Sequence, residues 1–104
     1  MQNDSREYII ELYDIYSNLL TEKQKQYFED YYFMDLSLSE IAENYSISRN
    51  GVYDQIKRVE QSLFEYEAKL SIYKKINMIE SLDIDKKIKE DILSILKEYN
   101  YGIW

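Results

Sequence analysis

A chain of 104 residues with no cysteine, no histidine and a net charge of −7 has a narrow range of chemistry open to it. The missing residue types exclude disulfides, thiolate nucleophiles, imidazole bases and the commonest zinc ligands. We therefore expect no enzymatic activity, no cofactor and no metal site. Helix breakers are also nearly absent, because there is no proline and glycine occurs only at positions 51 and 102. This composition predicts an all-α fold, a helical bundle in one domain over residues 1–104.

The chain has no apolar run near the roughly 18 residues of a membrane span. Its polar, acidic start does not resemble a signal peptide. We expect a cytoplasmic protein without membrane insertion.

Two amphipathic helices are predicted in the first third of the chain. Apolar side chains at three- and four-residue spacing predict a helix over about residues 5–19. Thr21 followed by Gln24 is a capping box, which predicts a second helix over about residues 22–34. The second helix has an aromatic face made of Tyr27, Phe28, Tyr31 and Tyr32.

Residues 37–60 have the pattern of a helix-turn-helix. Ser37 followed by Glu40 is another capping box and predicts a short helix over about residues 38–45. Ala42 lies where this helix would cross the next one, and its small side chain lets the two backbones approach closely. The apolar residues expected to fill the wedge between the helices are Ile41, Tyr45, Ile47, Val52 and Ile56.

A polar turn separates the two predicted helices. Ser46 stands where this motif often has glycine, so we expect it to adopt a left-handed conformation. Ser48 is a natural N-cap for the second helix. The simpler alternative is that residues 37–60 are two packed helices of a bundle that bind no ligand.

The first turns of the second motif helix carry the candidate nucleic-acid-binding residues. Arg49 and Asn50 are residue types that read base edges, whereas Lys57 and Arg58 are suited to phosphates. The free backbone amides at the start of the helix could also meet a phosphate. The full candidate set is Ser48, Arg49, Asn50, Tyr53, Asp54, Lys57 and Arg58.

The charge distribution predicts only a modest electrostatic contribution to such binding. Residues 1–47 carry three basic and ten acidic side chains, whereas positive and negative charges balance over residues 48–104. Within residues 48–58, three basic residues stand against one acidic residue. A weakly positive face on an acidic body does not favour strong non-specific DNA binding.

An apolar seam continues beyond the motif. Its residues recur at alternating intervals of four and three, and no breaker precedes about Leu82, so one long helix from residue 49 is predicted. In the simpler alternative, the seam packs within one chain on the first two helices and on a last helix, which is capped by Asp83 or Asp85 and ends near Tyr99. Otherwise a second subunit covers its far half. We expect a homodimer, with residues 61–104 as helical extension and dimerisation region. The seam consists of Val52, Ile56, Val59, Leu63, Tyr66, Leu70 and Tyr73.

The segment LTEKQKQYFEDYYFMDLSLSEIAENYSISRNGVYDQIKRVEQSLFEYEAKL resembles the YlxM family of small bacterial proteins and, more distantly, region 4 of bacterial sigma factors. The resemblance covers about residues 5–75. It implies a sigma-region-4-like helix-turn-helix, DNA recognition through residues 48–58, and a role in the signal recognition particle pathway. Gly51 and the weakly basic second helix depart from the sigma pattern, which leaves RNA or a protein open as the ligand.

Two functions are therefore expected. The first is a regulatory protein that binds DNA or RNA through its helix-turn-helix. The alternative is a protein-interaction module that binds a basic partner of the secretion machinery, such as a signal recognition particle component, through an acidic face that includes Glu7, Glu11 and Asp14. Twelve tyrosines could stack on single-stranded nucleic acid, but most lie at core spacing and are expected to fill the core with the hydroxyl at its rim. Tyr53 is the exception and should point outward.

Overall fold

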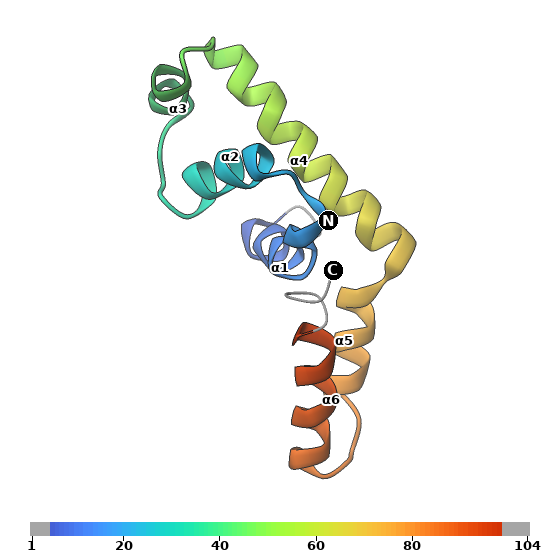
Figure 1. Ribbon diagram of the computed structural model, residues 1–104. Coiled ribbons are helices and arrows are strands. Elements are labelled where there is room, and N and C mark those ends of the chain that lie inside the picture. Colours follow the sequence, from blue (N-terminus) through green and yellow to red (C-terminus); the bar gives the residue numbers. More distant parts are fainter. Residues whose placement is uncertain (1–4, 99–104) are drawn as a thin grey trace.

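The computed structural model describes residues 5–98, which form six α-helices and no strand (Figure 1). The all-α fold is therefore confirmed. The longest helix, α4, forms a rod, with α1 to α3 along one side of it and the α5–α6 hairpin at its far end. The bounds are α1 Arg6–Tyr16, α2 Glu22–Tyr32, α3 Leu38–Tyr45, α4 Arg49–Leu70, α5 Ile72–Glu80 and α6 Lys86–Glu98, with a 3₁₀ turn at Ser17–Leu19.

Helix starts follow the capping residues closely. Thr21 Oγ1 accepts from the Gln24 N–H at 3.1 Å, and Gln24 Oε1 accepts from the Thr21 N–H at 2.9 Å. Ser37 and Glu40 form the same reciprocal pair at the start of α3. Asp85 is the cap at the start of α6, since its Oδ1 accepts from the Lys87 N–H at 2.7 Å. The expected end near Tyr99 lies outside the described residues.

Helix ends differ more from the prediction. The helix expected to reach residue 19 stops at Tyr16, because the chain tightens into the 3₁₀ turn. The helix expected to reach residue 34 stops at Tyr32. There the N–H groups of Phe33 and Met34 both donate to the Glu29 carbonyl at 2.9 Å, and Asp35 takes a positive φ of 59° that turns the chain toward α3.

The continuous helix predicted from residue 49 to about residue 82 is wrong. It breaks at Ser71, which has a φ of 55°, and α5 starts in a new direction (Figure 1). Part of the seam is covered within the chain, as the simpler alternative expects. Leu63 is fully buried in a cluster with α1 residues such as Leu12, so α1 provides the cover there. Leu70 remains 43% exposed.

Tyrosine hydroxyls tie the helices together through carboxylates. The expectation that tyrosines fill the core is confirmed for Tyr16 and Tyr27, which are 1% and 3% exposed. Four hydroxyls donate to a carboxylate on another helix, so several acidic residues have structural partners rather than only solvent. The pairs are Tyr13–Glu29 at 2.5 Å, Tyr16–Glu67 at 2.6 Å, Tyr45–Asp30 at 2.9 Å, and Tyr32–Glu60.

These tyrosines predict a loss of stability in alkaline solution. Burial, assisted by the bonded carboxylate, raises the pKa of Tyr13, Tyr16 and Tyr32 above the usual 10, and raises the pKa of Tyr45 to about 12. Above about pH 10 the unfolded chain releases protons that the folded chain keeps, so rising pH favours unfolding. Thermal melts followed by circular dichroism should show Tm falling between about pH 10 and 12. A constant Tm over that interval contradicts the prediction.

Candidate nucleic-acid interface

Helices α3 and α4 cross at a small, closed apolar cluster. Ile41 and Val52 are fully buried on either side of the crossing, and Ala42 is 8% exposed. Tyr27 of α2 and Ile56 of α4 are the other two buried residues of the cluster. A helix pair held in this way has a defined crossing angle, because the buried side chains leave no room to slide.

Ile47 does not fill the wedge, contrary to the prediction. It is 39% exposed, because it follows the left-handed turn and lies on its outer side. Its Cδ1 packs instead beside the first turn of α4, 3.7 Å from where a Cβ on Gly51 would stand.

The turn itself has the predicted geometry. Ser46 adopts φ 57° and ψ 43°, which is the left-handed conformation. Ser48 caps α4, since its Oγ accepts from the Gly51 N–H at 2.9 Å. A Cβ at position 51 would stand only 3.1 Å from that Oγ, so glycine leaves the capping hydroxyl its space. The glycine that departs from the sigma pattern thus has a local structural reason.

All seven candidate binding residues are exposed, on the face of α4 opposite its buried residues. Val52 and Ile56 point into the core, whereas Tyr53 between them is 49% exposed. Residues four apart lie above one another on a helix, so the exposed side chains form two adjacent rows. One row is Arg49, Tyr53 and Lys57, and the other is Asn50, Asp54 and Arg58, with Ser48 at the turn.

The cations on this face differ in their surroundings. Lys57 Nζ lies 3.3 Å from a Glu60 carboxylate oxygen and 5.8 Å from the centre of the Tyr53 ring. Among the side chains that the structure describes, those of residues 5–96, neither Arg49 nor Arg58 has an ion-pair partner. The two arginines therefore carry less compensated charge toward solvent than the lysine does.

Lys23 is a further cation beside the helix-turn-helix, and it is not among the predicted nucleic-acid-binding residues. It lies in the first turn of α2, and its Nζ stands 5.9 Å from the centre of the Tyr45 ring at the end of α3. Only the packing of α2 under α3 brings it there. The nearest signal in the sequence is that Lys23 is one of only three basic residues before position 48.

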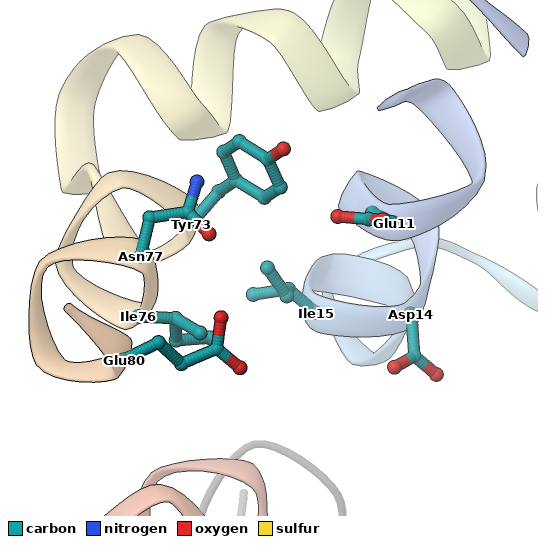
Figure 2. Close-up of a pocket in the computed structure, with 7 residues that line it drawn as sticks. All are labelled: Glu11, Asp14, Ile15, Tyr73, Ile76, Asn77 and Glu80. Atoms are coloured by element: carbon teal, nitrogen blue, oxygen red, sulfur yellow. The ribbon is translucent and has the colours of Figure 1, made fainter. Parts of the chain in front are cut away.

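A second candidate site is an acidic cleft of about 330 Å³ between α1 and α5 (Figure 2). Ile15 of α1 and Ile76 of α5 both line it, and carboxylates stand on both sides (Figure 2). Glu7, expected on the same acidic face, does not line it, and Glu80 was not foreseen because the helix break at Ser71 brings it there. The lining residues are Glu11, Asp14, Ile15, Tyr73, Ile76, Asn77 and Glu80.

No group of three or more histidine, cysteine, aspartate or glutamate side chains among residues 5–96 is arranged to hold a metal ion. No helix in that part of the chain is long and apolar enough to cross a membrane.

Comparison with known proteins agrees with the motif. A family model described as "Putative helix-turn-helix protein, YlxM / p13 like" matches residues 3–100. The chain belongs to this family. The expected resemblance is thereby confirmed, and it extends beyond residue 75 to include all of α5 and α6.

Members of the YlxM family from several bacteria are close in sequence. The chain is 44% identical over 93 residues to UPF0122 protein YlxM of Bacillus subtilis, covering 83% of this chain and 84% of that protein. It is 49% identical over 83 residues to UPF0122 protein FN1394 of Fusobacterium nucleatum, covering 80% and 79%. It is 51% identical over 79 residues to UPF0122 protein RBAM_015800 of Bacillus velezensis, covering 76% and 70%.

Proposed function

We propose that this protein is a cytoplasmic regulatory protein that lays the start of α4 against DNA or RNA. The observation that carries the proposal is the exposed arginine-led face of α4, displayed by a helix-turn-helix with a closed core. Membership of a family described by the same motif supports it. We further propose that the motif resembles sigma region 4. The YlxM resemblance is the reason to propose a role in the signal recognition particle pathway.

Each residue has a proposed role that follows from its chemistry. Arg49 and Asn50, in the first turn of α4, would read base edges. Arg58 and Lys57 would hold phosphates, with Arg58 the stronger contact because Lys57 is paired with Glu60. Tyr53 would contact a base or sugar with its exposed ring. Ser48 fixes the helix start as the N-cap, and Asp54 lies exposed in the middle of the proposed face.

We also propose that the protein acts as a homodimer, with residues 61–104 as the extension that joins the copies within single-domain subunits. Exposed apolar side chains on the α5–α6 hairpin support this, because such a surface favours association. Two copies would present two α4 helices to two half-sites. These exposed residues are Met78, Leu82, Ile84, Ile88 and Ile95.

The double substitution Arg49→Ala with Arg58→Ala tests the nucleic-acid proposal. We expect affinity for random-sequence duplex DNA or RNA oligonucleotides to fall several-fold, because the variant loses two positive charges from this face, including the proposed phosphate contact of Arg58. The salt dependence should also weaken by about one phosphate contact. Fluorescence anisotropy over a salt series measures both, with circular dichroism to verify unchanged helicity.

The matched control removes two cations elsewhere. Lys74→Ala with Lys75→Ala deletes the same charge from the exposed side of α5, far from the start of α4, and should leave affinity nearly unchanged. Equal losses in the two double variants would mean that overall charge, rather than the α4 face, governs binding.

The second candidate function is binding of a basic protein segment, and the acidic cleft is the observation that favours it. Its carboxylates suit the charged end of a lysine or arginine, and Ile15 and Ile76 offer contact to the methylene stem. Charge reversal at Glu11, Asp14 and Glu80, the carboxylates that line the cleft, should abolish this binding and leave nucleic-acid affinity intact. A pull-down from lysate with and without nuclease separates the two functions directly.

A further inference from the structure

The joint between α4 and α5 is a helix break without a breaker in the sequence. Neither glycine nor proline stands between residues 52 and 101, and the apolar seam continues through the joint to Tyr73. Ser71 nevertheless adopts φ 55° and ψ 34°, a conformation that an L-residue enters at a cost. Local sequence therefore favours one helix, and the bend needs a tertiary cause.

That cause is a latch made of Tyr16 and Glu67. The first N–H groups of a helix have no acceptor within the helix. Here the latch accepts hydrogen bonds from the first three N–H groups of α5. Ile72 N–H donates to the Tyr16 hydroxyl at 3.1 Å. The N–H groups of Tyr73 and Lys74 donate to the two Glu67 carboxylate oxygens at 3.0 and 3.1 Å.

The latch is itself held by the core. Tyr16 is 1% exposed and its hydroxyl donates to Glu67 at 2.6 Å, so a residue of α1 positions the carboxylate that caps α5. Packing adds to the bend, since Ile76 is 8% exposed and the rings of Tyr8 and Tyr73 meet edge to face at 5.0 Å. The bent joint therefore depends on α1 rather than on the joint residues.

We propose that this joint is a two-state device, bent while the latch is engaged and continuous over residues 49–80 when it is released. On straightening, every N–H group of the joint would keep a hydrogen-bond acceptor. The N–H groups of residues 72–74 would pass from the latch to the carbonyls of Ala68, Lys69 and Leu70, and Ser71 would leave the left-handed conformation.

Straightening changes two surfaces at once. The acidic cleft has one wall on α1 and the other on α5, so it exists only in the bent state (Figure 2). The α5–α6 hairpin would also swing away from α1 to continue the line of α4 (Figure 1). A ligand of the cleft would select the bent state, because it has differential affinity for the two forms.

Spin-label distances can measure the state of the joint, and the absence of native cysteine allows two labels to be placed cleanly. Exposed positions Gln61 and Ser81 lie on either side of the joint. In a continuous helix their backbones would be about 30 Å apart, at 1.5 Å per residue, and in the bent form they are closer. The unmodified joint should give mainly the shorter distance.

Substitutions at the joint should move the population in opposite directions. Ser71→Gly favours the bend, because glycine enters the left-handed conformation freely and is a poor helix former. Ser71→Ala favours the continuous helix. The ratio of bent to straight forms should differ roughly tenfold or more between them. Glu67→Ala, which removes the cap itself, should also increase the long-distance population.

The matched control is Tyr32→Phe, which removes the same type of tyrosine–carboxylate bond, to Glu60, away from the joint. It should leave the distance distribution unchanged. The proposal is overturned if Ser71→Ala and Glu67→Ala keep the short distance. It is equally overturned if they broaden the distances with a loss of helicity in circular dichroism, because α5 would then melt rather than join α4.

Discussion

Replacing Phe28 with alanine is expected to lower the free energy of unfolding by about 3–5 kcal/mol. Phe28 is fully buried and stacks against the rings of both Tyr13 and Tyr32, with centroids 4.1 and 4.4 Å apart. Alanine would remove both ring contacts and leave a cavity between α1, α2 and α4. Small domains have a total stability of only about 5–15 kcal/mol, so this is a large share of it.

Phe33→Ala is the matched control for this experiment. The substitution is chemically the same and lies at the end of the same helix. Phe33, however, is 50% exposed and makes only edge-to-face contacts with Tyr13 and Phe28. Urea unfolding followed by circular dichroism should show a clearly smaller loss for Phe33→Ala. Equal losses would mean that the stacked cluster does not carry the stability assigned to it.

Replacing Ala42 with leucine is expected to cost about 1–3 kcal/mol and to disturb the helix-turn-helix specifically. Ala42 is 8% exposed and packs in one cluster with Ile41 and Val52, both fully buried. Three added carbons would have to displace one of these side chains or push α3 away from α4. Either change would misplace the start of α4 and weaken any ligand contact made there.

Ala68→Leu is the control, because Ala68 is an exposed alanine within another helix of the chain, α4. It adds the same atoms where there is space and should change the free energy of unfolding little. Hydrogen exchange would locate the effect, with faster exchange expected in α3 and the first turns of α4 of the Ala42 variant. If the two leucine variants are equally stable, the crossing is not closely packed.

Predictions from sequence were most accurate where the governing interaction is local. The two capping boxes placed the starts of α2 and α3, since each needs only residues three apart. The left-handed turn at Ser46 and the cap at Ser48 followed in the same way. The direction of the outward face of α4 also follows from helical periodicity, because Val52 and Ile56 must point inward.

Predictions failed where a distant residue decides the outcome. Periodicity alone predicted one continuous helix through Ser71. It missed the break because the first N–H group of α5 donates to Tyr16, more than fifty positions earlier in the chain. The sequence pattern predicts no structural role for the acidic residues of the first half, yet Glu29 and Asp30 accept hydrogen bonds from tyrosines on other helices. Ile47 was placed in the wedge by spacing, although the turn carries it outside.

By itself, the sequence determined the helical class, the helix starts and the side of α4 that faces outward, because caps and periodicity act over a few residues. Tertiary structure alone decided that α1 covers Leu63, that Lys23 stands beside the motif, and that the chain bends at Ser71 to form the acidic cleft. These features depend on side chains far apart in the chain that meet only after the core has closed, and no local pattern records such a meeting.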